Sequence, residues 1–152
     1  MPTRSRSATR ALTLSTLAAT AALAGCVDLQ STGPQADYFS SRALARIYAL
    51  DDGSFEVVPE IGAQGAAYWC AASEYARRRL GADWSQDIYV AKGRAPSTVS
   101  GRIDSVTFTM SHVPSAEGKR PFINTFGFKP GDNFSVSSGD SFCRDLEPLF
   151  FF

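Results

Sequence analysis

Only one segment of this chain has the pattern of a long helix, and this limits the folds that the rest can form. Residues 63–80 are rich in alanine, contain no proline and stop at Gly81, a residue type typical of the position just after a helix. At about 100° per residue, Trp69, Ala72 and Ala76 share one face, which we expect to pack closely on a sheet. A parallel sheet needs a crossover, usually a helix, between successive strands. One helix therefore predicts an α+β fold with a mainly antiparallel sheet.

Five or six short strands are expected around this helix. Residues 43–50 and 54–59 are largely apolar segments joined by residues 51–53, and their Asp-Gly step is a strong hairpin signal. Residues 103–112 alternate between apolar and small polar side chains, as a half-buried strand does. Shorter strand patterns follow at residues 87–91, 120–128 and 134–136. The Ser-Ser-Gly-Asp stretch at residues 137–140 is expected to break the last strand.

The first 26 residues have the composition of an export signal. Three arginines precede an apolar run, and small residues follow up to a cysteine. The order Leu23, Ala24, Gly25, Cys26 resembles the lipobox of bacterial lipoproteins. The resemblance implies that a diacylglycerol is attached to the Cys26 thiol and that the chain is cut before Cys26, which removes residues 1–25.

Two other interpretations of this segment remain open: a secretory signal that is cut without lipidation, and an anchor that is never cut. The apolar run of about 13 residues is shorter than the roughly 20 that a membrane span needs. Asp28 and Gln30 do not extend it. Lipidation of Cys26 implies that a membrane of the bacterial cell envelope is a partner. Because position 27 is Val and not Asp, the resemblance to Gram-negative sorting rules favours the outer membrane, facing the periplasm.

Processing would divide the chain into a signal peptide (1–25), a lipidated cysteine with a flexible tether (26–40) and a single small α+β domain (41–152). Removal of the signal takes three arginines and no acidic residue, so the 15 Lys and Arg fall to 12 against 15 Asp and Glu. This balance predicts no nucleic-acid partner. The basic run 77–79 is expected to be an exposed face near a helix C-terminus, where cations suit the helix dipole. Glu74 is expected to point away from the sheet as well.

The expected export also affects whether the two remaining cysteines, Cys70 and Cys143, form a disulfide. Disulfides persist outside the cytosol, and an even pair of cysteines in a small exported domain is most simply a bridge. We therefore expect a Cys70–Cys143 disulfide. It would close a loop of about 74 residues, which the chain-entropy model values at roughly 4 kcal/mol.

A second use of Cys70 remains open. Cys70 lies in the first turns of the expected helix, where the dipole and free N–H groups lower a thiol pKa. His112, the single histidine, ends one expected strand, and Asn124 lies on the next. This order is similar to the papain-like arrangement of cell-wall hydrolases of the NlpC/P60 and CHAP type. The resemblance implies a cysteine hydrolase acting on peptidoglycan, although residues 68–72 depart from the Asp-Cys or Gly/Ser-containing stretch of those families.

No other pattern in the chain points to chemistry. One histidine and no Cys-x-x-Cys leave no usual zinc ligand set, and the glycines lack phosphate-loop spacing, so we expect no metal and no cofactor. The stretch from residues 68–72 to residues 88–90 is similar to small uncharacterised exported proteins of alphaproteobacteria, a resemblance that implies no activity. The sequence thus predicts an envelope lipoprotein with a binding or structural domain, whose partner is an envelope protein or peptidoglycan.

Overall fold

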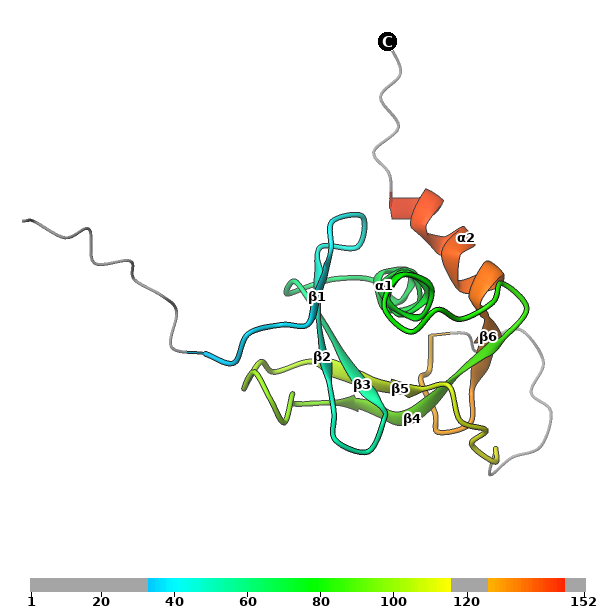
Figure 1. Ribbon diagram of the computed structural model, residues 1–152. Helices are drawn as coiled ribbons and strands as arrows, with labels where there is room; N and C mark the ends of the chain where they lie inside the picture. The colour runs from blue at the N-terminus through cyan, green and yellow to red at the C-terminus, as the bar shows by residue number, and fades with distance from the viewer. Residues whose placement is uncertain (1–32, 116–125, 147–152) are drawn as a thin grey trace, which may run out of the picture. The chain divides into compact units, whose positions relative to one another are not determined.

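The computed structural model describes residues 33–115 and 126–146, which form an α+β fold (Figure 1). Its elements are β1 (Tyr38–Ser40), β2 (Ala45–Ala49), β3 (Phe55–Pro59), α1 (Gly65–Arg78), β4 (Asp87–Ala95), β5 (Ser105–Thr109), β6 (Asn133–Ser135) and α2 (Val136–Leu146). The six strands of the described residues make one sheet in the order β1-β2-β3-β5-β4-β6. Every neighbouring pair is antiparallel, so the predicted fold class is confirmed.

The hairpin predicted from the Asp-Gly step joins β2 to β3. Ala49 pairs with Phe55, and the Leu50 N–H donates to the Ser54 carbonyl oxygen at 2.9 Å. Gly53 has a φ of +80°, a region that glycine enters without steric cost. The sheet begins earlier than residue 41, because β1 lies on the edge beside β2, within the segment that the sequence assigns to the tether.

In the second half of the sheet, the strands begin and end at other residues than the sequence predicts, and one predicted strand is not formed where the structure describes it. Strand β4 runs to Ala95, four residues beyond the predicted end, and two register shifts bend it against β5. Strand β5 is shorter than the predicted 103–112, and it is buried on both faces instead of half-buried: Val106 and Phe108 lie in the core, and the small polar residues Ser105, Thr107 and Thr109 are buried as well. Of the strand predicted at 120–128, residues 120–125 lie outside the described residues, and residues 126–128 form a turn and loop instead of a strand.

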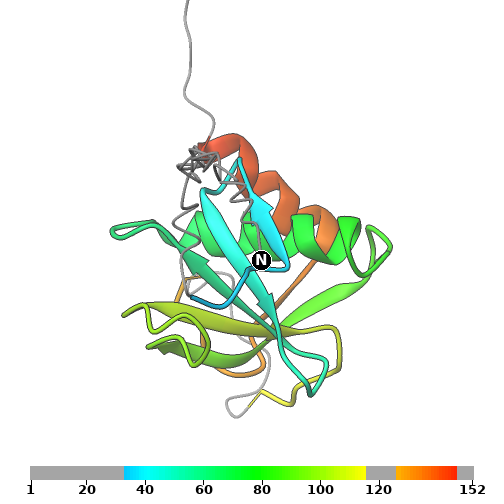
Figure 2. The ribbon, with the colours of Figure 1, turned by 60° about the vertical axis from the view of Figure 1, so that its left-hand side comes forward.

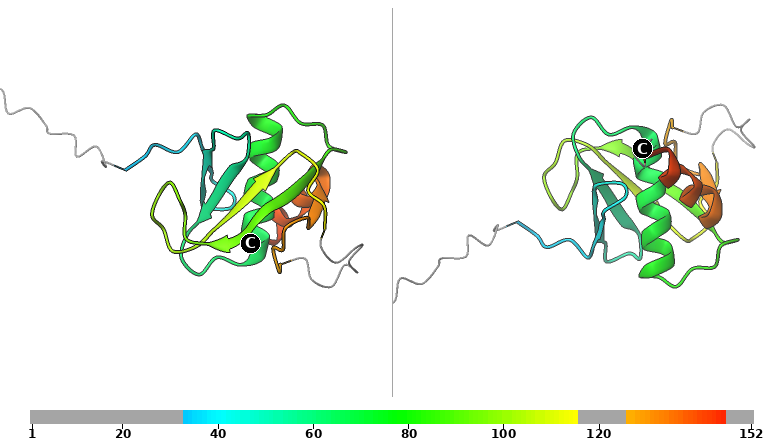
Figure 3. Two further views of the ribbon diagram at one scale, coloured as in Figure 1. Left: turned by 90° about the horizontal axis from the view of Figure 1, so that it is seen from below. Right: turned by 90° about the horizontal axis from the view of Figure 1, so that it is seen from above.

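Helix α1 lies in the curve of the sheet, as Figure 1 shows by viewing the helix nearly end-on. Figure 2 shows it lengthwise behind β1 and β2. Every residue from Gly65 to Ala76 is buried, so the helix has no solvent face over most of its length. Glu74, which is expected to point away from the sheet, is not exposed to solvent there, because only 5% of it is accessible. The reason is a second helix, α2, which covers the side of α1 that the sheet leaves open (Figure 3).

Helix α2 occupies the stretch where the sequence predicts a break. Ser135 caps it, because the Ser135 Oγ accepts the Ser138 N–H at 3.2 Å and satisfies a backbone donor that the first turn leaves without a helical partner. Val136 and Gly139 are buried against the rest of the domain. The predicted break at residues 137–140 is therefore wrong, and its serines and glycine form the first turns of a helix.

The core between the sheet and the helices is aromatic. The Trp69 ring on α1 meets the rings of Phe108 and Phe134 edge-on, with centroids 5.0 and 4.8 Å apart. The Phe55 ring lies 4.7 Å from that of Tyr75 further along the helix. All the described elements and this core lie between residues 38 and 146. A polypeptide of residues 27–152 thus contains every described element and the whole of this core.

Candidate functional site

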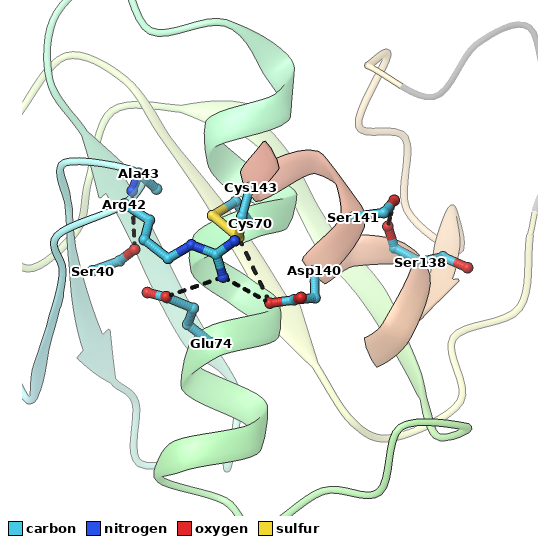
Figure 4. The surroundings of a disulfide bond; sticks show 9 residues. All are labelled: Ser40, Arg42, Ala43, Cys70, Glu74, Ser138, Asp140, Ser141 and Cys143. Carbon is cyan, nitrogen blue, oxygen red and sulfur yellow. Dashed lines mark hydrogen bonds and ion pairs between the residues drawn. A yellow bond between two sulfur atoms is a disulfide. The ribbon is translucent and has the colours of Figure 1, made fainter. Parts of the chain in front are cut away.

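A disulfide joins the two helices, from the middle of α1 to the last turn of α2. The Cys70 and Cys143 sulfurs are 2.08 Å apart, and the Cα atoms are separated by 4.8 Å (Figure 4). Both residues are fully buried. The structure therefore contains the bridge that the sequence predicts, and the bridge ties the C-terminal helix to the helix that the sheet surrounds.

The bridge bears on whether Cys70, His112 and Asn124 could form a catalytic site. A sulfur held in a disulfide carries no thiolate, so Cys70 is not a nucleophile in this state. His112 is exposed, and its ring meets that of Tyr89 edge-on at 5.3 Å. Asn124 lies outside the described residues, as do Cys26 and the residues before it that resemble a lipobox. A Cys-His-Asn arrangement is consequently not assembled within the described part of the chain.

Beside the bridge, a cluster of charged side chains connects three elements. The Arg42 Nη1 atom, from the turn between β1 and β2, lies 3.1 Å from an Asp140 carboxylate oxygen on α2 and 3.7 Å from the Glu74 carboxylate on α1 (Figure 4). The turn is held by the Ser40 Oγ, which accepts the Ala43 N–H at 3.1 Å. A carboxylate as buried as that of Glu74 is costly unless a cation compensates it. Arg42 supplies that cation.

A surface pocket of about 320 Å³ opens next to this cluster. Its lining combines three arginines, two carboxylates and one tryptophan: Arg42, Glu74, Arg77, Arg78, Trp84 and Asp140. Trp84 is half exposed, and the Arg77 guanidinium lies 4.5 Å above its ring. Arg77 also donates to the Ala82 carbonyl oxygen, which fixes the stack. The lining thus consists of charged side chains and one aromatic ring. Such a lining suits the binding of a charged surface or group better than catalysis on a substrate enclosed in an apolar cavity.

Sequence reasoning missed this cluster. Nothing in the local sequence marks Arg42, which becomes important only because the β1–β2 turn lies over α1. A usable signal was present at Glu74, a carboxylate in an alanine-rich helix, but its partners are distant in sequence. Trp84 follows the end of α1 and gives no periodic pattern.

A second buried carboxylate lies on β3 and has a structural role. The Glu56 carboxylate accepts hydrogen bonds from the Ser97 Oγ at 2.6 Å, the Thr98 Oγ1 at 2.6 Å and the Thr98 N–H at 3.0 Å. Burial raises the pKa of Glu56, but these hydrogen bonds outweigh it and hold the pKa below its usual value. Because both oxygens are occupied as acceptors, Glu56 fixes the loop after β4 onto the sheet.

A third ionic contact lies at the other end of α1. The Arg94 guanidinium is 3.1 Å from an Asp104 carboxylate oxygen and 4.8 Å from the centre of the Tyr68 ring. Burial raises the pKa of the Tyr68 hydroxyl well above its usual range. Tyr68 therefore stays neutral at physiological pH and serves as a surface on which the arginine stacks.

Residues 33–115 and 126–146 contain no group of three or more His, Cys, Asp or Glu side chains that could hold a metal ion. Neither helix in this part of the chain is long and apolar enough to cross a membrane. Comparison with known proteins finds no match to this chain among family models, curated proteins or solved structures. The function is thus inferred from the sequence and the geometry alone.

Proposed function

We propose that this chain is a lipid-anchored protein of the bacterial cell envelope, and that its disulfide-stapled domain binds or supports another envelope component instead of catalysing a reaction. The observation that carries the proposal is the buried Cys70–Cys143 bridge. Bridges of this kind form and persist outside the cytosol. The bridge also accounts for two of the three cysteines and leaves Cys26, the residue to which the lipobox resemblance assigns a diacylglycerol.

The anchor follows from the first 26 residues. A charged start, an apolar run too short for a membrane span and Leu-Ala-Gly-Cys occur together at the right distance from the N-terminus. Each buried CH₂ of an acyl chain contributes about 0.8 kcal/mol, so two or more chains hold a protein stably on a membrane. Val27 after the cysteine supports placement in the outer membrane, with the domain in the periplasm. The proposed partner of the domain is an envelope protein or peptidoglycan.

The test of the anchor is the Cys26→Ser variant expressed beside wild type in a Gram-negative host. We expect wild type in the membrane fraction, released by detergent but not by high salt. The variant should remain unprocessed or leave the membrane. Ser31→Ala, in the expected tether, is the control and should behave as wild type. A Cys26→Ser protein of mature length that stays in the membrane fraction would overturn the anchor.

The competing function, a papain-like hydrolase acting on peptidoglycan, requires a different state of Cys70. It needs a thiolate near His112, whereas the sulfur is bonded to Cys143. Titration of free thiols in residues 27–152 separates the two proposals. The binding or structural domain gives no thiol under native conditions, and the hydrolase gives at least one that reacts quickly with iodoacetamide near neutral pH.

A further inference from the structure

The C-terminal end of α1 presents a surface in which arginines surround exposed apolar side chains. We call it the arginine–tryptophan surface and define it as Arg77, Arg78, Arg79, Leu80 and Trp84. Leu80 is 46% exposed and Trp84 is 50% exposed, large values for apolar side chains of this size. Arg77 stacks on the Trp84 ring, so the arginine holds the indole in place at the surface.

The positive charge of this surface is not cancelled by close ion pairs. Arg42 is the partner of both nearby carboxylates on the helices, those of Glu74 and Asp140. In the described part of the chain, none of the three arginines of the surface forms an ion pair with a carboxylate. The flanking carboxylates are those of Asp37 and Asp83, and Asp37 accepts the Ala49 N–H at 2.6 Å. Counted with the adjoining Arg42, Glu74 and Asp140, four arginines lie against four carboxylates, so the region is neutral in sum and its positive charge is local to the exposed guanidinium groups of Arg78 and Arg79.

The surface also lies where the chain leads toward the expected anchor. The Arg79 Nη2 atom donates to the Asp37 carbonyl oxygen at 2.7 Å, and the Arg79 guanidinium lies 5.8 Å from the centre of the Tyr38 ring. Figure 3 (right) shows the start of the described chain at the same end of the domain as the end of α1. About 11 residues separate Cys26 from Asp37, a length that spans at most about 40 Å when extended and about 18 Å on average when flexible.

We propose that the arginine–tryptophan surface rests on the anionic phospholipid surface in which the Cys26 lipid is anchored, and so fixes the orientation of the domain. Tryptophan favours the membrane interface, and arginine is drawn to anionic headgroups. A short tether gives an effective concentration in the millimolar range, so a weak intrinsic affinity is sufficient. The inference depends on the proposed anchor, because the anchor brings this end of the domain to the membrane.

The test couples residues 26–152 through the Cys26 thiol to a maleimide-bearing lipid. The Cys70–Cys143 bridge leaves no other thiol for this reaction. The vesicles contain phosphatidylglycerol and phosphatidylcholine, or phosphatidylcholine alone, with bromine on the acyl chains as a quencher of tryptophan fluorescence. We expect Trp84 to be quenched on the anionic vesicles, with less quenching on neutral vesicles or in high salt. The Trp84→Phe variant measures the background from the buried Trp69.

Substitutions at Arg78 give the decisive comparison, because this side chain is exposed and no described contact depends on it. Arg78→Gln should lower the ratio of membrane-docked to undocked domain about fivefold, and Arg78→Lys should keep it. Arg102→Gln, an exposed arginine in the loop between β4 and β5, is the matched control and should match wild type. Equal quenching on anionic and neutral vesicles, or an Arg78→Gln result equal to the control, would overturn the proposal.

The result is independent of the anchor test, because the chemical coupling replaces the natural lipid. If the coupled domain docks but Cys26→Ser does not change fractionation in cells, the anchor alone is wrong. If fractionation behaves as expected but Trp84 is not quenched, the membrane is not the occupant of this surface. An acidic protein partner, tested by the same Arg78 variants, then becomes the explanation for the exposed arginines.

Discussion

Gly139 on α2 lies against Ser73 on α1: a Cβ atom at position 139 would come within 2.1 Å of the Ser73 Oγ and 3.2 Å of the Trp69 carbonyl oxygen. Gly139 precedes Cys143 by one helical turn, and Ser73 follows Cys70 by nearly one turn. The disulfide and the absence of a side chain at Gly139 therefore both concern the surfaces at which α1 and α2 meet. The disulfide holds the helices together at one turn, and glycine allows the close approach at the next.

This contact predicts that Gly139→Ala destabilises the domain, although alanine favours a helix over glycine by about 1 kcal/mol. Overpacking of a fully buried contact should cost about 1–3 kcal/mol and outweigh that gain. Urea unfolding of residues 27–152 measures the difference. Ser141→Ala, at an exposed position of the same helix, should change stability little. Adding Ser73→Ala to Gly139→Ala should recover part of the loss, and an absence of such coupling would contradict the steric explanation.

The same glycine explains why α2 could not be predicted. Residues 137–140 combine two serines, a glycine and an aspartate, which local propensity assigns to a turn. The helix starts there because Ser135, just before this stretch, caps the Ser138 N–H, and the glycine is needed for packing on α1. By contrast, α1 and the β2–β3 hairpin were predictable because alanine content, Gly81 and the Asp-Gly step act locally. Only tertiary contact makes residues 136–146 a helix.

The bridge predicts a symmetrical pattern of stability. Cys70→Ser and Cys143→Ser should each lower the free energy of unfolding by about 2–5 kcal/mol, since each removes the same buried cross-link. The double variant should cost little more than either single one. Intact mass before and after reduction under denaturing conditions checks the bridge, which adds two hydrogens when it opens. His112→Ala serves as the control with no effect on the bridge. Unequal effects of the two serine variants would point to a separate role for one cysteine.

The charged cluster shows a different limit of sequence reasoning. Glu74 lies three residues before Arg77 on the helix, and the local pattern predicts only that it points away from the sheet. The structure instead buries the carboxylate and compensates it with Arg42, 32 residues earlier in the chain. A pairing across that distance depends on how the β1–β2 turn packs over α1, and no periodicity in either segment encodes it.

This pairing predicts non-additive effects. Arg42→Met leaves the buried Glu74 carboxylate without its cation and should cost about 1–3 kcal/mol of unfolding free energy. Glu74→Gln in the Arg42→Met background should restore part of that stability, because it removes the uncompensated charge. Arg46→Met, at an exposed position on β2, is the matched control and should be nearly neutral. If the two substitutions simply add, the ion pair does not stabilise the cluster.

The hydrogen bonds to Glu56 predict how stability depends on pH. The folded-state pKa of Glu56 lies below its usual value of about 4.3, so the folded domain binds this proton less readily than the unfolded chain does. The stabilisation is present above that usual value and is lost as pH falls through the folded pKa. Unfolding free energies measured in urea from pH 7 down to pH 3 should therefore fall with acid.

The Glu56→Gln variant tests whether the Glu56 carboxylate causes the decrease in unfolding free energy at low pH. The amide keeps the size of the side chain but replaces a charged acceptor with a neutral one, so we expect a loss of about 1–3 kcal/mol at pH 7. The loss should shrink at low pH, because the wild-type carboxylate is then protonated as well. Glu60→Gln, four residues on and exposed, should leave both the stability at pH 7 and the acid dependence close to wild type. An acid dependence that is the same in Glu56→Gln and Glu60→Gln would show that Glu56 does not hold the loop after β4 through its charge.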